Sequence, residues 1–161
     1  MTILLAVEAR RESFVRSFAY ASGPAYGLLL DEAAPGWTRR LKKDDDLAEL
    51  LPQVEHELDG RRIPFRVERT RGLEDGVARA LRAVEADEVP VVFSGDGLIG
   101  AVGGAMAGAE TPLGIVPGGR GNDLARVLGI PDDPAGAVAV LASGEERRID
   151  VGEANGKRFL G

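Results

Sequence analysis

The sequence predicts an α/β protein with a three-layer, Rossmann-like parallel sheet, and three observations support this fold class. Helical and strand patterns alternate along most of the 161 residues, which is typical of parallel sheets covered by helices. Residues 89–93 and 113–116 are continuous apolar runs, as expected of strands buried on both faces. Each run ends in a glycine-rich turn that opens another helix, and ligands bind at such strand ends in open parallel sheets.

The first half of the chain alternates strand and helix after a less regular start. Strands are expected where short segments are apolar, or alternate apolar and polar residues, at 2–7, 26–30 and 63–70. Helices are expected where apolar residues recur every three or four positions, at 14–18, 47–58 and 73–84. Aspartates 44–46 favour the start of the second helix, Gly60 follows its end, and Pro90 follows the third helix.

Helices and a hairpin are predicted in the second half of the chain. The expected helices are 98–107, which consists mostly of small residues, 122–128 and 134–144. Asp133 and Pro134 suit the N-cap and first turn of the last helix, and Gly144 suits its end. The last two expected strands are 147–151 and 157–160. Asn155-Gly156 between them is typical of a tight hairpin turn.

The hairpin interrupts the alternation of strand and helix, which indicates a change of domain. We expect an N-terminal extension of unclear role at 1–24, an α/β domain at 25–146 and the first hairpin of a truncated, β-rich domain at 147–161.

Composition and charge exclude several classes of function. The net charge of -6 and the pI near 4.9 argue against nucleic-acid binding, which requires a basic surface. The chain has no cysteine, so disulfides, thiolate metal sites and thiol catalysis are excluded, and the single histidine, His56, is expected on an exposed helix face. The apolar segment 1–7 is too short to span a membrane and no signal-peptide pattern follows, so a cytoplasmic location is expected.

Two glycine-rich turns are the most informative feature. Ser94-Gly-Asp-Gly-Leu-Ile-Gly100 and Pro117-Gly-Gly-Arg-Gly-Asn-Asp123 each follow a buried strand and precede a helix. Glycines permit positive φ angles and close approach of an anion, and a helix N-terminus offers free N–H groups to a phosphate. Because adjacent strand ends lie side by side, the two turns suit the phosphates of one nucleotide, and Arg120 adds a positive charge.

Three polar side chains in these turns each have two interpretations. A phosphate would repel Asp96 unless Mg²⁺ lies between them or the carboxylate removes a proton from an acceptor hydroxyl. Alternatively, Asp96 only forms a hydrogen bond within its own turn. Asn122 and Asp123 are functional candidates, but both are also good N-cap residues for the helix that follows.

A dinucleotide site is an alternative at the first turn. Gly95-x-Gly97-x-x-Gly100 matches the dinucleotide fingerprint. A Rossmann site, however, places an acidic residue at the end of the following strand, where this chain has Pro117-Gly118. The motif also follows the third strand of the repeat rather than the first, which argues against NAD-dependent oxidoreduction. No Walker A sequence, with its Gly-Lys-Ser/Thr ending, occurs in the chain.

The two turns resemble the paired motifs of the lipid kinases that include diacylglycerol and sphingosine kinases, with NAD kinases as more distant members. The matching motifs are Ser94-Gly-Asp-Gly-Leu98, Gly119-Arg-Gly-Asn-Asp-Leu-Ala-Arg126 and Leu128-Gly-Ile-Pro131. The resemblance runs from about residue 47 to residue 161. It implies that 25–146 is a nucleotide-binding domain and that a β-sandwich domain begins in 147–161, with ATP in the cleft between them.

The resemblance also implies a reaction and its site residues. The reaction is transfer of the γ-phosphoryl group of ATP to a lipid such as diacylglycerol or a sphingoid base, with Asp96 as catalytic base or Mg²⁺ ligand. The nucleotide-binding residues implied are Thr70, Ser94, Gly95, Asp96, Gly97, Leu98, Ile99, Gly100, Gly119, Arg120, Asn122 and Asp123. The acceptor pocket is expected largely in the second domain, so this portion alone should be inactive. A lipid substrate also implies peripheral contact with a membrane.

Departures from the family pattern keep other functions open. The family's Asn-Pro-x-Ser-Gly segment corresponds to 31–36, which matches it poorly, and Ala101 and Gly104 replace an acidic residue and an asparagine. One alternative is therefore a non-catalytic nucleotide-binding or regulatory module, and another is an NAD kinase-like activity on a soluble acceptor. An exposed strand edge in the C-terminal hairpin is compatible with a homodimer.

Overall fold

The computed structural model describes residues 2–9, 26–31 and 44–160 and contains a four-stranded parallel sheet with the order β3-β2-β4-β5. Its strands are β2 (Tyr26–Asp31), β3 (Phe65–Thr70), β4 (Pro90–Ser94) and β5 (Gly114–Pro117). The sequence places all four strands correctly to within a few residues. Because β2 lies between β3 and β4, the chain moves one way along the sheet from β2 to β3 and the other way afterwards.

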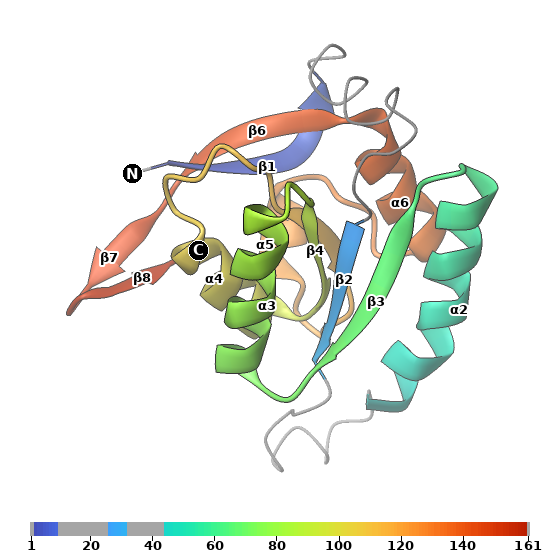
Figure 1. Ribbon diagram of the computed structural model, residues 1–161, viewed down its shortest axis with the longest axis horizontal. Helices are drawn as coiled ribbons and strands as arrows, with labels where there is room; N and C mark the ends of the chain where they lie inside the picture. Colours follow the sequence, from blue (N-terminus) through green and yellow to red (C-terminus); the bar gives the residue numbers. More distant parts are fainter. Residues whose placement is uncertain (1, 10–25, 32–43, 161) are drawn as a thin grey trace.

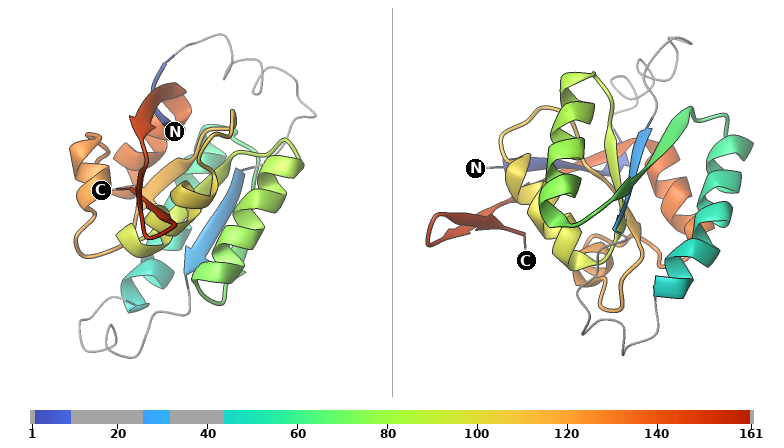
Figure 2. Two further views of the ribbon diagram at one scale, coloured as in Figure 1. Left: turned by 90° about the vertical axis from the view of Figure 1, so that its left-hand side faces the viewer. Right: turned by 60° about the horizontal axis from the view of Figure 1, so that its bottom comes forward.

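Helices connect and cover these strands. They are α2 (Asp44–Gly60), α3 (Leu73–Glu85), α4 (Asp96–Ala105), α5 (Asp123–Val127) and α6 (Pro134–Ser143). α3 packs on α4, and α2 packs on α6. In the two views of Figure 2, β2 lies between α3 and α2. Right-handed crossovers explain this placement, because connections that run in opposite directions along a sheet place their helices on opposite faces.

The core lies at β4 and β5 and at the inner faces of α2, α3, α4 and α6. β4 and β5 are buried along their whole length, which explains why their sequences are continuous apolar runs. α3 turns Gly76, Ala80 and Ala83 toward the core. A Cβ atom on Gly76 would lie 2.6 Å from Cδ1 of Leu98, a residue of α4. Small residues on α3 therefore allow the two helices to pack closely.

The first glycine turn is shorter than predicted. α4 begins at Asp96 rather than at residue 98, so only Gly95 separates it from β4. Glycines permit positive φ, but within these turns positive φ occurs only at Asn122, with φ 49°. Instead, Gly95 and Gly119 allow the main chains of the two turns to approach each other closely.

The chain termini form two further antiparallel pairs. The strand expected at 2–7 is β1 (Thr2–Ala9), which pairs with β6 (Glu145–Asp150). β7 (Gly152–Ala154) and β8 (Lys157–Phe159) form the hairpin around Asn155 and Gly156, which have φ angles of 52° and 72°. The predicted pairing of 147–151 with 157–160 is wrong, because β6 pairs with β1 and the two-residue turn fixes the pair Ala154–Lys157. Figure 1 shows the hairpin extending from the rest of the molecule.

Other sequence expectations have clear outcomes. The Asp133 carboxylate accepts a hydrogen bond of 2.8 Å from the Gly136 N–H, and Gly144 ends α6 with φ 68°, as predicted. His56 is exposed, as expected. The helix expected at 14–18 and the segment 32–36 lie outside the described residues. Among the helices that the structure describes, none has the length and apolar character needed to cross a membrane.

The contact between α4 and β8 gives a first test of the fold. A Cβ atom on Gly104 would lie 2.9 Å from the Arg158 carbonyl oxygen, whereas one on Gly100 would meet nothing within 4 Å. Gly104→Ala and Gly100→Ala gain similar helix propensity, about 0.5–1 kcal/mol each. We expect only Gly104→Ala to displace β8 and to speed amide hydrogen exchange at 157–159. Equal exchange in both variants would contradict this packing.

Candidate functional site

The two glycine turns lie side by side at the carboxyl ends of β4 and β5. Ser94 is paired with Pro117 in the last register position, and the Gly118 N–H donates a hydrogen bond of 2.9 Å to the Ser94 carbonyl oxygen. This bond continues the sheet ladder into the turns. The predicted adjacency of the two turns is therefore observed.

The main chains of the turns touch at Gly95 and Gly119. A Cβ atom on Gly119 would lie 2.5 Å from Cα of Gly95, and a Cβ atom on Gly95 would lie 3.1 Å from Cα of Gly119. The first distance is shorter than real Cβ contacts, and backbone on the other side cannot rotate away as a side chain can. Gly119 is therefore required for the approach of the two turns.

Asn122 holds the second turn in shape. Its side chain is buried, with 7% of the residue exposed, and its backbone is in the left-handed region, which asparagine tolerates. Oδ1 accepts a hydrogen bond of 2.8 Å from the Gly119 N–H, and Nδ2 donates one of 3.1 Å to Oδ1 of Asp132. Asn122 occupies the N-cap position of α5, but its side chain makes no capping hydrogen bond. The sequence therefore predicts the N-cap position of Asn122 correctly, but the expected capping hydrogen bond of its side chain is not formed.

Asp96 supplies a capping interaction to α5 from a different helix. The Leu124 N–H donates a hydrogen bond of 3.3 Å to Oδ1 of Asp96. A Cβ atom on Gly121 would lie 3.0 Å from Oδ2 of Asp96, so Gly121 makes room for this carboxylate. The sequence offered two roles for Asp96, in catalysis or within its own turn. The structure adds a third role, a link between the first turn and the second.

A pocket of about 250 Å³ opens beside this link. It is lined by two carboxylates and by apolar or small groups: Asp96, Asp123, Gly100, Leu124, Val127 and Leu160. Val127 is 80% exposed, so its side chain is accessible from solution. The pocket therefore combines an acidic edge with an apolar wall.

Two arginines lie on the second turn and α5. Arg120 is exposed, as expected of a side chain that meets a ligand from solution. Arg126 donates to Oδ1 of Asp123 at 2.6 Å and to the Gly121 carbonyl oxygen. This ion pair is largely exposed and contributes at most about 1 kcal/mol to stability. Its local effect is to restrain the Asp123 side chain at the rim of the pocket.

Thr70 lies on the same edge of the sheet but farther from the turns. It is the last residue of β3, is completely buried and is paired with Asp31 of β2. Since β2 separates β3 from β4, Thr70 lies two strands away from Ser94. The carboxyl ends of parallel strands share one edge, so Thr70 and both turns face the same side of the molecule.

Sequence reasoning missed some residues of the site. Asp132 accepts a hydrogen bond from the Asn122 side-chain amide, but it lies ten positions away and no local pattern in the sequence indicates this contact. Val127 and Leu160 look like ordinary helix and strand residues, and only the fold places them at one pocket. Within the described ranges, no group of three or more acidic or histidine side chains is arranged to hold a metal ion.

The hydrogen bonds of Asn122 give a test of this geometry. Asn122→Ala removes the hydrogen bonds of the buried Asn122 side chain to the Gly119 N–H and to Asp132, and we expect the free energy of unfolding to fall by about 1–3 kcal/mol. Asn155→Ala is the matched control, since Asn155 also has positive φ but lies exposed in the β7–β8 turn. Chemical denaturation of both variants should show a clearly larger loss for Asn122→Ala. Similar losses would mean that the backbone conformation, not the hydrogen bonds, causes the effect.

Comparison with known proteins identifies the family of this chain. The diacylglycerol kinase catalytic domain family matches residues 43–154. A Pseudomonas aeruginosa protein described as "Probable lipid kinase YegS-like" is 42% identical over 106 residues, which cover 63% of this chain and 33% of that protein. A diacylglycerol kinase of Staphylococcus aureus is 33% identical over 96 residues, which cover 56% and 30% of the two chains.

The solved structure of a diacylglycerol kinase from Bacillus anthracis is also similar. It superposes with a TM-score of 0.62 at 26% identity and covers 84% of this chain, but only 45% of the Bacillus chain is matched. The chain thus spans about a third of the length of the curated relatives it matches. The family match extends over well over half of the chain and includes both glycine turns, so the chain belongs to the diacylglycerol kinase catalytic domain family.

Proposed function

We propose that this chain is the nucleotide-binding portion of an ATP-dependent lipid kinase. The observation that carries the proposal is the main-chain contact of Gly95 with Gly119, which places two turns at one sheet edge. The proposal includes a three-layer, Rossmann-like domain at 25–146, preceded by an extension at 1–24. Residues 147–161 would begin a β-sandwich domain that completes the ATP cleft.

The N-terminus of α4 would bind the phosphates of ATP. α4 has ten residues, and its N-cap residue, Gly95, has no side chain to satisfy the N–H groups of the first turn. These groups point along the helix axis and attract anions. Ser94 to Gly100 would line the phosphates on one side and Gly119 to Asp123 on the other. The exposed Arg120 guanidinium would offset the negative charge that Asp96 adds.

Asp96 would act at the acceptor hydroxyl. In the transfer, the hydroxyl oxygen forms a bond to the γ-phosphorus, the bond to the ADP oxygen breaks, and the Asp96 carboxylate accepts the hydroxyl proton. The donor set also fits Mg²⁺, because this ion binds through one or two carboxylates together with substrate phosphates, and both Asp96 and Asp123 line the pocket. When bound, Mg²⁺ would neutralise phosphate charge.

The pocket beside Asp96 suits the acceptor end of a lipid. Its carboxylates disfavour an anionic group, whereas an alcohol can donate a hydrogen bond to them. Leu124, Val127 and Leu160 would contact the carbon atoms next to that hydroxyl. A diacylglycerol or a sphingoid base has this combination of a hydroxyl and an apolar chain. The rest of the acceptor site would lie in the second domain.

A non-catalytic nucleotide-binding module is the second candidate, and one observation favours it. Oδ1 of Asp96 already accepts the Leu124 N–H, so the carboxylate has a structural role that needs no reaction. An NAD kinase-like activity on a soluble acceptor would use the same phosphate site with a different acceptor. Cytoplasmic location, peripheral membrane contact and pairing of two copies through the β7–β8 edge complete the proposal.

Asp96→Asn in the full-length protein separates the kinase from the module. Asparagine keeps an oxygen for the Leu124 N–H but cannot take the hydroxyl proton. We expect kcat for phosphorylation of diacylglycerol or sphingosine, assayed with ATP and Mg²⁺, to fall by about 10²–10⁴-fold. ADP binding should persist. Asp133→Asn, which keeps the cap of α6, should retain full activity.

Two results would favour the alternatives. If the unmodified protein and Asp96→Asn both bind ADP and neither phosphorylates any acceptor, the chain is a binding module. If NAD rather than a lipid is phosphorylated, the acceptor assignment is wrong, while the phosphate site stands.

Nucleotide titration of the present chain tests the phosphate site directly. ADP with Mg²⁺ should shift the backbone amide NMR signals of 95–98 and 119–121, because these main-chain groups line the proposed site. Adenosine, which lacks phosphates, is the control and should leave those signals in place. Shifts confined to other segments would refute the proposed nucleotide position.

A further inference from the structure

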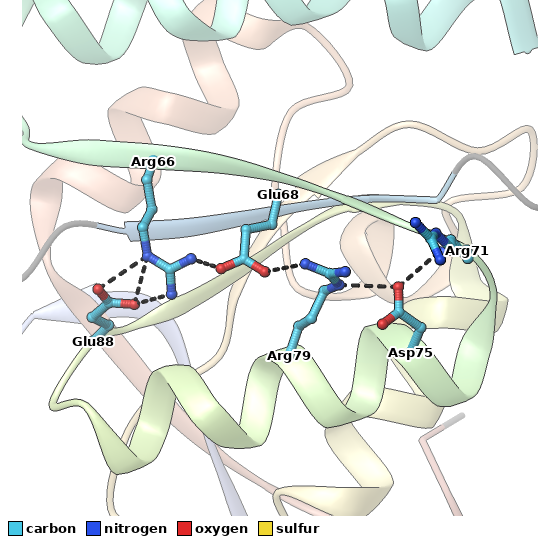
Figure 3. Close-up of polar contacts among 6 residues, drawn as sticks. All are labelled: Arg66, Glu68, Arg71, Asp75, Arg79 and Glu88. Carbon is cyan, nitrogen blue, oxygen red and sulfur yellow. Dashed lines mark hydrogen bonds and ion pairs between the residues drawn. The ribbon is translucent and has the colours of Figure 1, made fainter.

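A chain of six polar residues joins β3 to α3 (Figure 3). The carboxylate of Glu88, which precedes β4, accepts hydrogen bonds from Nε of Arg66 at 3.1 Å and from Nη2 of Arg66 at 2.5 Å. Arg66 also forms an ion pair with Glu68. Glu68 contacts Nη1 of Arg79 at 2.5 Å. The remaining links connect Arg79 to Asp75 and Asp75 to the main chain of Arg71. The four side chains Arg66, Glu68, Arg79 and Asp75 are only 23–39% exposed, so the network runs along a partly covered seam.

The two ends of this network lie at opposite ends of β3. Arg66 and Glu88 lie near the start of β3, at the edge of the sheet away from the glycine turns. Asp75 lies in the first turn of α3, next to the turn that follows Thr70. The same network therefore has one end at the proposed nucleotide side and one end remote from it.

Asp75 fixes the main chain between β3 and α3. Its Oδ2 accepts a hydrogen bond of 2.9 Å from the Arg71 N–H and one of 3.0 Å from Nε of Arg79. The next residue, Gly72, has φ 148° and ψ -179°, a conformation that is essentially restricted to glycine, and it offers no side chain to cap α3. The turn is therefore held by a side chain from inside the helix. The Arg79 guanidinium and, after it, the Arg71 N–H keep the pKa of Asp75 below its usual range.

We infer that Asp75 and Arg79 are positioning residues for the nucleotide. Arg79 orients the Asp75 carboxylate, the carboxylate holds the Arg71 N–H, and this bond sets the path of the main chain directly after Thr70. Neither side chain needs to touch the ligand. The inference rests on the proposed nucleotide site and specifies how the edge strand contributes to it.

The test is ADP affinity in the present chain, measured by calorimetry with Mg²⁺ at a temperature well below unfolding. Asp75→Ala removes the acceptor of the Arg71 N–H, and we expect about five- to tenfold weaker ADP binding. Asp75→Asn keeps an oxygen for that N–H and should recover most of the affinity. Arg79→Met should weaken binding by a smaller factor, since the carboxylate is still present.

Arg66→Met is the matched control, because it breaks the same network at its remote end. It should lower the melting temperature about as much as Arg79→Met does, yet leave ADP affinity unchanged. Equal loss of affinity in both arginine variants, or unchanged affinity in Asp75→Ala, would overturn the inference. If Asp75→Ala does not fold, the ADP affinity of Arg79→Met compared with that of Arg66→Met tests the inference. If neither this chain nor the full-length protein binds ADP, the proposed function itself fails.

Discussion

The main-chain contact between Gly95 and Gly119 is the constraint on which the site depends. β4 and β5 are paired to their last residues, so the turns that follow them start only one strand spacing apart. Any side chain at Gly119 would push these turns away from each other. Asp96 then reaches across to α5, and Asn122 folds the second turn back onto Gly119. The polar side chains thus stabilise an approach that glycine alone permits.

Local sequence patterns predicted the sheet well because two of its strands, β4 and β5, are buried on both faces. Such strands need continuous apolar runs, and β4 and β5 have them. The hairpin turn was also legible, since Asn155 and Gly156 tolerate positive φ. The partner of β6 could not be predicted, because the pairing with β1 joins segments more than 130 positions apart and no local pattern encodes it. Contacts between segments so far apart in the sequence depend on the three-dimensional arrangement of the whole chain.

The same limit explains which parts of the site could be predicted. The adjacency of the two turns follows from parallel strands, so the sequence was sufficient. The role of Asp96 at α5 depends on the distance between two helices, and the sequence alone suggested only contacts within its own turn or with a ligand. A carboxylate that caps a neighbouring helix is held in one orientation. That restraint would suit a group that meets an acceptor hydroxyl, so the observed link to α5 is compatible with the catalytic role proposed for Asp96.

The turns that follow the strands of the sheet are held by two different kinds of contact. The adjacent strands β4 and β5 hold their turns by mutual main-chain contact, and both strands are buried along their whole length. β3 is the edge strand on the side of the sheet away from those two turns, and its own terminal turn is held by Asp75 through the Arg71 N–H. It alternates Phe65 and Val67, which pack on the core, with Arg66 and Glu68 on the polar seam with α3. Side-chain contacts of Asp75 and Arg79 therefore hold the turn after β3, whereas close glycine packing holds the turns after β4 and β5.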